Sequence, residues 1–368
     1  MKTYNVLGLM SGSSLDGLDI AHCEFAETET GWTYKILDAD VVDFPSKWKL
    51  RLRNLVMQNA ITYLKTDIYF GHFIGETINH YINENDIRDE LDFVAWHGQT
   101  IFHQPENNLT SQVGSGAAVA EKSGMPVICD FRSNDVALGG QGAPMVPIGD
   151  KYLFPEHKFC LNLGGISNIS CKTNDRIIGY DTCIGNIVLN SLANKMEMEY
   201  DKGGALARTG EVNADLLREM NSSWYYDKDY PKSLSGGWVR KVMMPVLKKF
   251  NISTEDKLAT SCEHIAKQIA HNIEIIYDRE NVDKEDTDTM LISGGGAFNT
   301  FLVERISEHS PVKTVVPSDD IVNFKEAIAL AFAGILRTQN KVNLLSSVTG
   351  SSQDNIGGVI YQSAKKQY

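Results

Sequence analysis

The sequence predicts an α/β protein built from two related halves, and three observations support this prediction. Short apolar segments typical of buried strands alternate with longer segments of helical spacing. A strand, a turn of small residues and a returning strand occur at the start of the chain and again near residue 160. The length of 368 residues suits about two domains of ~150 residues each. We therefore expect a boundary between the halves near residues 140–158.

The first half is expected to begin with a β-hairpin. Tyr4–Leu9 is apolar and β-rich, the turn Ser11–Gly17 breaks it, and Leu18–Phe25 resumes an extended apolar pattern. Helical spacing follows from Ser46 to about Asn85. The remaining elements of this half are short: strands at Asp92–Ala95 and Pro126–Cys129, and a helix at Gly116–Gly124.

The second half repeats this start. Phe159–Leu163 reads as a strand, Gly164–Asn168 as a turn and Ile169–Cys171 as a returning strand. Another short strand, Ile177–Tyr180, is expected to end just before Asp181. The later elements are a helix at Thr254–Tyr277 with Ser253 and Asp256 in capping-box spacing, a strand at Met290–Ile292 and a helix at Phe324–Leu336.

Composition excludes several classes of protein. The 35 basic and 47 acidic side chains give a net charge of −12, which argues against a general binder of nucleic-acid phosphates. Met1–Leu9 has no signal-peptide core and no apolar run reaches ~18 residues, so we expect neither secretion nor membrane spanning. The six cysteines include no C-x-x-C pair, which is typical of reduced cysteines in a cytoplasmic protein.

Three turns rich in glycine each follow an apolar strand: Ser11–Gly17, Gly164–Asn168 and Gly294–Asn299. A tight turn that exposes successive N–H groups can bind an anion, and glycine lets a phosphate approach the backbone. A single turn of this kind is usually a simple hairpin, but three in one chain favour nucleotide binding. The P-loop and Rossmann patterns are absent. Such turns on a duplicated α/β chain are typical of ATPases of the actin, hexokinase and Hsp70 type.

Eight motifs between Leu7 and about Gly358 make the comparison more specific. They are GLMSGSSLDGLDIA (8–21), WHGQT (96–100), DFR (130–132), GGQGAPMVP (139–147), NLGGISNIS (162–170), DTCIGN (181–186), SGGGAFN (293–299) and SVTGS (347–351). Taken together and in this order, they resemble the bacterial anhydro-N-acetylmuramic acid kinase family.

The resemblance implies a two-lobed, actin/hexokinase-like (ribonuclease H-like) fold with an ATP cleft between a lobe at 1–150 and a lobe at 151–368. As an alternative to a second lobe that includes the whole of 151–368, the C-terminal end packs back on the first lobe. It implies a cytoplasmic kinase of cell-wall recycling that uses ATP and Mg²⁺, opens 1,6-anhydro-N-acetylmuramic acid with water and phosphorylates O6. The partner is a small amino sugar, with no nucleic acid or membrane, and a homodimer is left open.

The resemblance also implies which residues bind ATP, although it does not say which acid organises Mg²⁺. Ser11 stands where many relatives in the wider ATPase superfamily carry an acid. The implied ATP-binding residues are Gly12, Ser13, Ser14, Leu15, Asp16, Gly17, Leu18, Asp19, Gly164, Gly165, Gly294, Gly295, Gly296 and Asn299.

Asp181 matches the catalytic aspartate of the family motif D-T-G-P-G-N, which implies that it is the general base. From the residues alone, an aspartate that caps the following helix would be the more common role. Cys183 and Ile184 replace the Gly-Pro of the motif, so this turn lacks the glycine and the fixed φ that the family has here. Cys183 could be read as a nucleophile, but a small buried thiol is the better interpretation.

Four residues are implied to bind the sugar: His97, Thr100, Arg132 and Glu326. The planar fork of Arg132 suits a carboxylate or phosphate, but an ion pair with Asp130 or Asp135 is an equal alternative. Two alternatives remain for His97: it is a structural histidine, or it forms a metal site with His103, although nothing else nearby completes such a site. Glu326 is out of place on an apolar helix unless it lies in the first turn, where acids are favoured.

Two alternatives to this function remain at this stage. One is a related sugar or acyl kinase that acts on an ordinary hydroxyl. The other is a non-catalytic, ATP-dependent regulatory protein. A further departure from the family is PKSLSGGW at Pro231–Trp238, where the bacterial pattern is P-K-S-T-G-R-E; we assign no function to this segment from the sequence.

Overall fold

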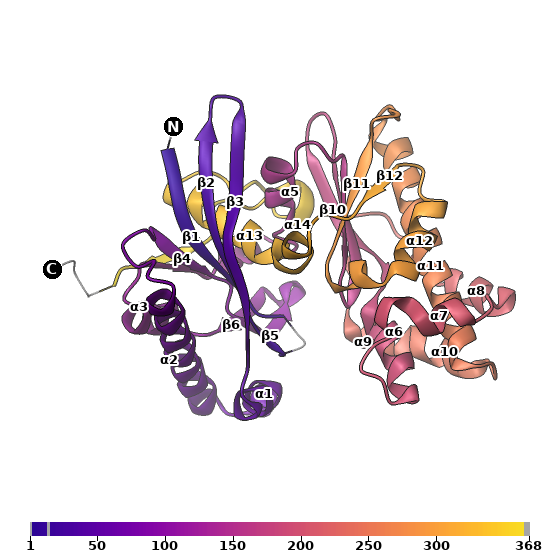
Figure 1. Cartoon of the computed structure of the whole chain (residues 1–368), viewed down its shortest axis with the longest axis horizontal. Coiled ribbons are helices and arrows are strands. Elements are labelled where there is room, and N and C mark those ends of the chain that lie inside the picture. Colours follow the sequence, from indigo (N-terminus) through magenta and orange to yellow (C-terminus); the bar gives the residue numbers. More distant parts are fainter. Residues whose placement is uncertain (1, 13–14, 364–368) are drawn as a thin grey trace. The chain divides into compact units, whose positions relative to one another are not determined.

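The computed structural model describes residues 2–12 and 15–363. The chain divides into two compact units, each of which can be followed by its labels in Figure 1. Unit 1 comprises residues 1–154 and 324–368, and unit 2 comprises residues 155–323.

Unit 1 contains a six-stranded sheet in the order β13-β7-β4-β1-β2-β3. The first three strands are antiparallel, whereas β4 is parallel to β1 and β7 is parallel to β4. A separate hairpin of β5 and β6, which the sequence analysis missed, follows β4. The strands are β1 (Lys2–Met10), β2 (Gly17–Thr28), β3 (Gly31–Asp43), β4 (Phe93–Trp96), β5 (Gln99–Gln104), β6 (Leu109–Val113), β7 (Val127–Cys129) and β13 (Val359–Tyr361).

Helices pack on both faces of this sheet because successive residues of β1 face opposite sides. Leu7 shares a buried cluster with Phe70 of α2. A Cβ at Gly8 would lie 2.0 Å from the carbonyl oxygen of Ala327, so glycine lets α13 approach β1 closely. The helices are α1 (Ser46–Arg53), α2 (Ala60–Glu84), α3 (Gly116–Ser123), α4 (Ser133–Ala137), α5 (Pro147–Leu153), α13 (Asp319–Thr338) and α14 (Ser346–Thr349).

Unit 2 contains a five-stranded sheet in the order β10-β9-β8-β11-β12. Its strands are β8 (Phe159–Leu163), β9 (Ile166–Lys172), β10 (Ile177–Ile184), β11 (Thr289–Ser293) and β12 (Lys313–Val315). Its helices are α6 (Asn186–Ala193), α7 (Ala205–Thr209), α8 (Ala214–Asn221), α9 (Gly236–Trp238), α10 (Met244–Lys249), α11 (Thr254–Glu280) and α12 (Thr300–His309).

Apart from β13, which pairs antiparallel with β7 at one edge of the sheet in unit 1, the two sheets share one topology, which confirms the predicted duplicated α/β fold. In each, the first three strands form an antiparallel meander with the first strand innermost, and two later strands extend the sheet parallel to that strand. This is the strand order of a ribonuclease H-like fold. The parallel strands end at one edge of each sheet, where ligands of α/β proteins usually bind.

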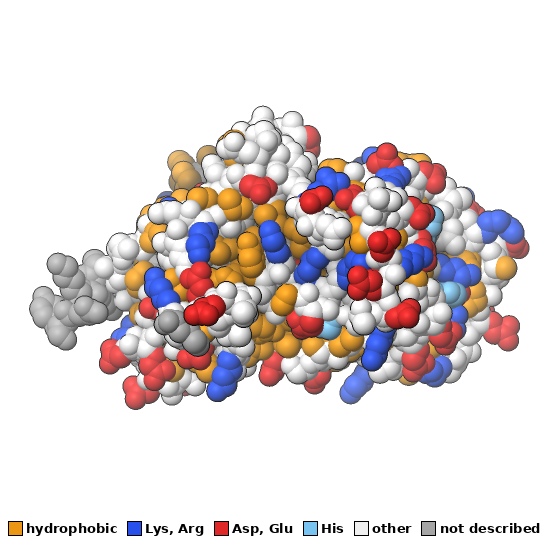
Figure 2. Space-filling model, turned by 90° about the horizontal axis from the view of Figure 1, so that it is seen from above, with side chains coloured by type: hydrophobic (Ala, Val, Ile, Leu, Met, Phe, Trp, Pro, Cys, Tyr) orange, Lys and Arg blue, Asp and Glu red, His pale blue; other side chains and the backbone are white. Residues whose placement is uncertain are grey.

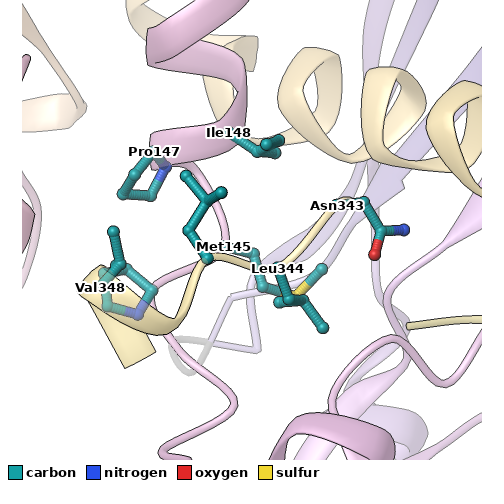
Figure 3. Close-up of a pocket in the computed structure, with 8 residues that line it drawn as sticks. Met145, Pro147, Ile148, Asn343, Leu344 and Val348 are labelled. Atoms are coloured by element: carbon teal, nitrogen blue, oxygen red, sulfur yellow. The ribbon is translucent and has the colours of Figure 1, made fainter. Parts of the chain in front are cut away.

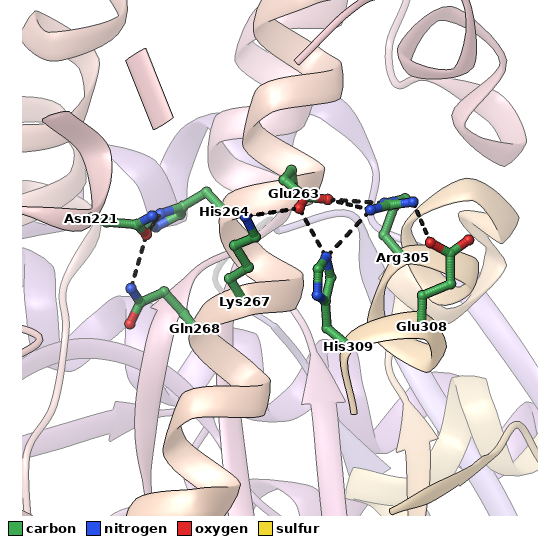
Figure 4. A network of polar contacts seen from close by, with 8 residues as sticks. All are labelled: Asn221, Glu263, His264, Lys267, Gln268, Arg305, Glu308 and His309. Carbon is green, nitrogen blue, oxygen red and sulfur yellow. Dashed lines mark hydrogen bonds and ion pairs between the residues drawn. The ribbon is translucent and has the colours of Figure 1, made fainter. Parts of the chain in front are cut away.

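A polar network ties α11 to α12 inside unit 2 (Figure 4). Glu263 is buried on α11 and accepts hydrogen bonds from Arg305 Nε at 2.9 Å and from His309 at 2.8 Å, while Lys267 lies 3.2 Å away. Ser253 caps α11 by accepting from the N–H of Asp256, as its spacing predicts. Because Glu263 is surrounded by cations of its own unit, we assign this cluster to packing.

The long helix predicted from Ser46 to Asn85 is broken into two. α1 ends at Arg53, a short 3₁₀ turn covers Leu55–Met57, and α2 begins at Ala60. The side chain of Asn59 accepts from the N–H of Thr62 and so caps the start of α2. The helical spacing on both sides of the break hid this cap in the sequence.

On the face in Figure 2, acidic and basic side chains lie interspersed. Within residues 2–12 and 15–363, no helix is long and apolar enough to cross a membrane.

Candidate active site

Asp181 lies inside β10, so the prediction that it follows a strand is wrong: β10 continues to Ile184. The pairing of β10 with β9 shifts register between Asp181 and Cys183, which makes Thr182 the extra residue of a β-bulge. The Thr182 hydroxyl donates to the carbonyl oxygen of Ser167 at 3.0 Å. Asp181 is the one partly exposed residue of an otherwise buried strand. Bulges of this kind re-aim a side chain beside active sites.

Three contacts hold Asp181. Its N–H donates to the carbonyl oxygen of Lys232 at 3.2 Å, and its own carbonyl oxygen accepts from the hydroxyl of Tyr225 at 2.7 Å. The N–H of Leu234 donates to Oδ2 of the carboxylate at 2.7 Å. One carboxylate oxygen is therefore held by the backbone.

The electrostatics of Asp181 suit a general base. Burial raises the pKa of its carboxyl to about 6, and the hydrogen bond from Leu234 partly opposes that shift. A group with this pKa is ionised at pH 7 and still accepts a proton readily. The alternative that Asp181 caps the next helix is wrong, because Gly185 is the N-cap residue of α6 and no side chain caps that helix.

Cys183, two residues further on, is fully buried in the core of unit 2. Burial raises the pKa of its thiol to about 12, so the nucleophilic thiolate is not formed at neutral pH. The interpretation of Cys183 as a small buried thiol fits this environment. All six cysteines are buried, and none of them forms a disulfide.

The turn between β8 and β9 packs against the start of α6. The N–H of Asn186 donates to the carbonyl oxygen of Gly164 at 2.9 Å, and that of Ile187 donates to Gly165 at 3.2 Å. The side chain of Asn186 donates to Leu163 at 3.1 Å. These bonds fix the two glycines; phosphate binding by this turn stays a prediction.

The three glycines after β11 differ in the room around them. A Cβ at Gly294 would lie 2.2 Å from Oδ1 of Asn162, and one at Gly296 would lie 2.7 Å from Cβ of Leu163. Gly295 is exposed, and the nearest atom to its Cβ position is 3.9 Å away. Packing therefore requires the first and third glycine, whereas Gly295 has the open space that a phosphate would need.

Asn299 ends this turn and caps α12, since its side chain accepts from the N–H of Leu302 at 3.0 Å. The cap accounts for an asparagine at this position. An additional contact of Asn299 with ATP stays a prediction.

In unit 1, the first glycine turn joins β1 to β2. Gly12 is exposed, and its carbonyl oxygen accepts from the N–H of Leu15 at 3.2 Å; Ser13–Ser14 lie outside the described residues. A Cβ at Gly17 would lie 2.7 Å from a carbonyl oxygen of β3, and Leu18 is fully buried. The side chain of Leu18 belongs to the core, so a contact of this residue with ATP would have to come from its backbone.

A buried pair connects this turn to the segment after β4. The hydroxyl of Ser11 donates to Oε1 of Gln99 at 2.5 Å, and Nε2 of Gln99 donates to the carbonyl oxygen of Gly12 at 3.3 Å. Both side chains are buried. Two motifs almost ninety residues apart, GLMSGSS and WHGQT, are thus joined in one site.

Three carboxylates come close together at this edge of unit 1. The pKa of Asp19 is raised to about 7, first by burial and then by the negative charges of Glu326 and Asp16. Glu326 lies well past the first turn of α13, which begins at Asp319, so a role as a first-turn acid is wrong. Over the described residues, no group of three His, Cys, Asp or Glu side chains could hold a metal by itself.

His97 follows β4 and is buried. Burial, then the charge of Arg132, lowers its pKa to about 3, so the ring is neutral. Its Nδ1 lies 2.7 Å from the carbonyl oxygen of Gly98, which can only accept, so the proton sits on Nδ1. Nε2 is therefore a bare acceptor, and it is buried without a hydrogen-bond partner in the described part of the chain.

Arg132 follows β7 at the start of α4. No salt bridge joins it to Asp130 or Asp135: the first accepts from Ser133, and the second accepts from Gly142 and other groups. Burial lowers the pKa of Arg132 to about 10, partly offset by nearby Glu326, so it stays cationic at neutral pH. Its Nε is buried and unpaired among the residues that the structure describes.

Thr100 lies in β5 opposite Gln112, three residues after His97. His103 is exposed at the far part of β5 and lies 3.2 Å from the hydroxyl of Thr110. The two histidines belong to no metal-binding group of the described residues. Electrostatic interactions link His97 to Arg132, Arg132 to Glu326, and Glu326 to Asp19, and His103 interacts with His97 and Arg132.

Sequence reasoning missed three functional candidates: Gln99, Asn186 and Lys232. Each lies inside a segment that was quoted for other reasons, WHGQT, DTCIGN or PKSLSGGW. For Gln99 and Asn186 the available signal was a polar residue shortly after an apolar strand, whereas no such signal marks Lys232. Only the fold shows that Gln99 donates to Gly12, Asn186 to Leu163 and Lys232 to Tyr226.

A small pocket in unit 1 lies between the loop after Gly142 and the segment before α14 (Figure 3). Its polar side chain, Asn343, donates to Ala333 and Gly357 and accepts from Gly357. The pocket offers few free polar groups to a sugar, so we do not assign it to the substrate. Its other lining residues are Pro144, Met145, Pro147, Ile148, Leu344, Leu345 and Val348.

Comparison with protein families finds a match over almost the whole chain. Residues 4–363 match the model of the family described as anhydro-N-acetylmuramic acid kinase. A curated protein of that name from Sulfurimonas denitrificans is 33% identical and aligns over 97% of this chain and 99% of the relative. Another, from Aliivibrio fischeri, is 35% identical over 98% of this chain and 99% of the relative.

Solved structures are more distant. The activator of 2-hydroxyisocaproyl-CoA dehydratase from Clostridium difficile, with bound ADPNP, is 14% identical, with a TM-score of 0.42 and coverage of 91% of this chain and 97% of that one. Component A of the Acidaminococcus fermentans (R)-2-hydroxyglutaryl-CoA dehydratase is 12% identical, with a TM-score of 0.45 and coverage of 89% and 96%. The fold assignment rests on the strand order of the two sheets instead.

Proposed function

This chain belongs to the anhydro-N-acetylmuramic acid kinase family, and from this premise we propose the reaction that its residues perform. Its function is that of a kinase in cell-wall recycling, with ATP as phosphate donor and an amino sugar as acceptor. In 1,6-anhydro-N-acetylmuramic acid, O6 is bonded to the anomeric carbon and is no free hydroxyl. Water adds to C1 and the C1–O6 bond breaks. O6 then takes the γ-phosphoryl group, and the products are N-acetylmuramic acid 6-phosphate, ADP and a proton.

Asp181 is the general base of this reaction. It takes a proton from the attacking water. General-base catalysis of this kind typically raises the reaction rate by ~10²–10⁴-fold. The observation that carries the proposal is the carboxylate at the bulge of β10, with a pKa of about 6 and with Oδ2 held by Leu234. Oδ1 is the oxygen left to receive the proton.

Arg132 and His97 bind the sugar. Arg132 carries a positive charge with a buried, unpaired Nε, so it suits the lactyl carboxylate of the muramic acid. His97 presents an acceptor at Nε2, so it suits a donor such as a sugar hydroxyl or the N-acetyl N–H. Burying a polar atom without a hydrogen-bond partner costs free energy, and a polar ligand would give a partner to both Nε of Arg132 and Nε2 of His97.

Asp19 and Glu326 fit a role in holding Mg²⁺. Magnesium bound to a nucleotide needs only one or two protein carboxylates, because phosphate oxygens and water supply its other ligands. Burial raises the pKa of Asp19 first, and the negative charges of Glu326 and Asp16 raise it further; a cation would relieve this repulsion. When bound there, Mg²⁺ would neutralise charge on the transferred phosphoryl group.

We expect Asp19→Asn to raise the Mg²⁺ concentration for half-maximal activity by about fivefold or more, because one charged ligand is lost. Titration calorimetry with Mn²⁺ and a non-hydrolysable ATP analogue should show the same weakening. Glu24→Gln is the matched control, since Glu24 is an exposed acid of the same strand, β2, and lies outside the cluster of Asp19, Glu326 and Asp16. Equal metal affinity in the Asp19 variant and the parent would contradict this assignment.

Mass spectrometry of the products tests the reaction as a whole. The enzyme is incubated briefly with ATP, Mg²⁺ and the anhydro sugar in ¹⁸O-labelled water. One ¹⁸O atom is expected at C1 and none in the phosphate. Because the open sugar exchanges its anomeric oxygen slowly, unlabelled product kept in the same water for the same time provides the correction. Phosphorylation of a free hexose without incorporation of ¹⁸O would favour an ordinary sugar kinase instead.

A further inference from the structure

The segment Tyr230–Leu234, to which the sequence assigned no function, lies beside Asp181. Two of the three contacts that hold Asp181 come from it: the carbonyl oxygen of Lys232 accepts from the backbone, and the N–H of Leu234 donates to Oδ2. The third contact comes from Tyr225. The orientation of the carboxylate therefore depends on where this segment is held.

Lys232 anchors the segment from within the protein. Lys232 is only 9% exposed. Its ammonium lies 5.1 Å from the ring centre of Tyr225 and 5.6 Å from that of Tyr180. It also donates to the carbonyl oxygen of Tyr226 at 3.4 Å. Both rings belong to residues joined to Asp181: Tyr180 precedes it in β10, and Tyr225 is hydrogen-bonded to it.

A buried cation at this place needs an explanation. No salt bridge joins Lys232 to a carboxylate in the described parts of the chain, and burial lowers its pKa to about 8. A methionine would fill the same volume without a charge to desolvate. What the cation adds is attraction to two aromatic faces and to one carbonyl oxygen. Those partners lie on the elements that surround Asp181.

The first residue of the segment, Tyr230, is anchored as well. The ring of Tyr230 stacks on that of Tyr180 at 4.8 Å between centres, and its hydroxyl donates to Glu280 of α11 at 2.7 Å. The backbone between Tyr230 and Leu234 is thus fixed on both sides of Lys232. A short segment held in this way keeps its N–H groups in place more firmly than a free loop does.

We propose that Lys232 is a positioning residue for the general base: it holds the segment so that Leu234 N–H occupies Oδ2 of Asp181 and leaves Oδ1 for the water. This inference rests on the proposed role of Asp181. The hydrogen bond from Leu234 favours the ionised carboxyl. Loss of the anchor should therefore turn the carboxylate away from the water and also raise the pKa of the base.

The test is Lys232→Met in the full-length chain, assayed for kcat, for KM and for the pH profile of kcat. We expect kcat at pH 7 to fall about fivefold, with both KM values within about twofold, because only the base is disturbed. The acidic limb of the profile should move up by roughly half to one pH unit, the effect of one lost hydrogen bond to the charged form. Lys232→Arg keeps the cation and should recover part of both effects.

Lys228→Met is the matched control. Lys228 also lies over an aromatic ring, 4.4 Å from the centre of Trp224, but it is exposed and makes no contact with Asp181. It should leave the pH profile unchanged. If Lys232→Met does not fold, Lys232→Gln keeps a donor for the carbonyl oxygen of Tyr226 and answers the same question.

Two results would overturn the proposal: an unmoved acidic limb in a folded Lys232→Met or Lys232→Gln variant, or a rise in both KM values in step with the loss of kcat. The second would indicate a merely structural lysine. Failure of the proposed function looks different, because the parent enzyme itself would then lack an acidic limb near pH 6, or Asp181→Asn would stay active.

Discussion

Asp181→Asn is expected to lower kcat by ~10²-fold or more, while the binding of ATP and of the anhydro sugar stays close to normal. Asparagine has nearly the same size, and its side-chain oxygen can still accept from the N–H of Leu234. What it lacks is a carboxylate that can take the proton of the attacking water. Steady-state kinetics together with calorimetric binding of both substrates separate the two effects.

The pH dependence of the parent enzyme provides a second measurement on Asp181. A base must be ionised, and burial raises the pKa of this carboxyl to about 6. Activity should therefore fall as the pH drops through about 6, which is higher than for an ordinary aspartate. In Asp181→Asn the small remaining activity should no longer show this limb.

Asp201→Asn is the control for Asp181→Asn. Asp201 is also a buried aspartate of unit 2 that accepts backbone hydrogen bonds, from Leu206 and Ala207 at 2.8 and 2.9 Å. We expect its replacement to act on stability and not on the chemical step. An Asp181 variant that turns over at close to the parent rate would contradict the assignment, and Glu326 would then be tested as the base.

The duplicated fold was predictable because its signals are local. Each half begins with an apolar strand, a turn of small residues and a returning strand, and these correspond to β1–β2 and β8–β9. Period and turn chemistry reveal such units without knowledge of distant contacts. The hairpin of β5 and β6 was missed because most of its residues are polar and most are only half-buried, so alternation is weak there.

The bulge at Asp181 was not predictable from the sequence. The apolar run Ile177–Tyr180 ends at a charged residue, which by composition marks the end of a strand. The strand continues because Thr182 bonds to Ser167, and because Lys232 and Leu234 pair with the aspartate from about fifty residues away. Contacts of this range leave no pattern in a single sequence.

The glycine turns were predicted as a group, but the structure separates their members. A Cβ at Gly294 would collide with Asn162 and one at Gly296 with Leu163, both in β8, so packing alone accounts for these two glycines. Gly295 has no such neighbour, and its identity calls for a different reason, such as a bound phosphate. Sequence shows that glycine is present; only the fold shows which glycine is required for packing.

The case for Arg132 also depends on the fold. The ion pairs with Asp130 and Asp135 that the sequence allowed are absent, since these carboxylates bind Ser133 and Gly142. Arg132 thus keeps a buried Nε without a partner among the described residues. A guanidinium in this state is a strong donor for a carboxylate, and the lactyl group is the carboxylate of the muramic acid substrate.

We therefore expect Arg132→Lys to raise KM for anhydro-N-acetylmuramic acid by roughly 10–100-fold, because lysine keeps the charge but loses the planar pair of donors. For an anhydro sugar without the lactyl group, KM should rise only about twofold or less, since no carboxylate is there to be bound. Both KM values are measured at saturating ATP. Equal rises for the two sugars would show that Arg132 serves another part of the substrate or the phosphate, and unchanged KM values would remove it from the sugar site. The decisive quantity is the difference between the rises in KM for the two sugars, because a general distortion of unit 1 would weaken the binding of both sugars to the same extent.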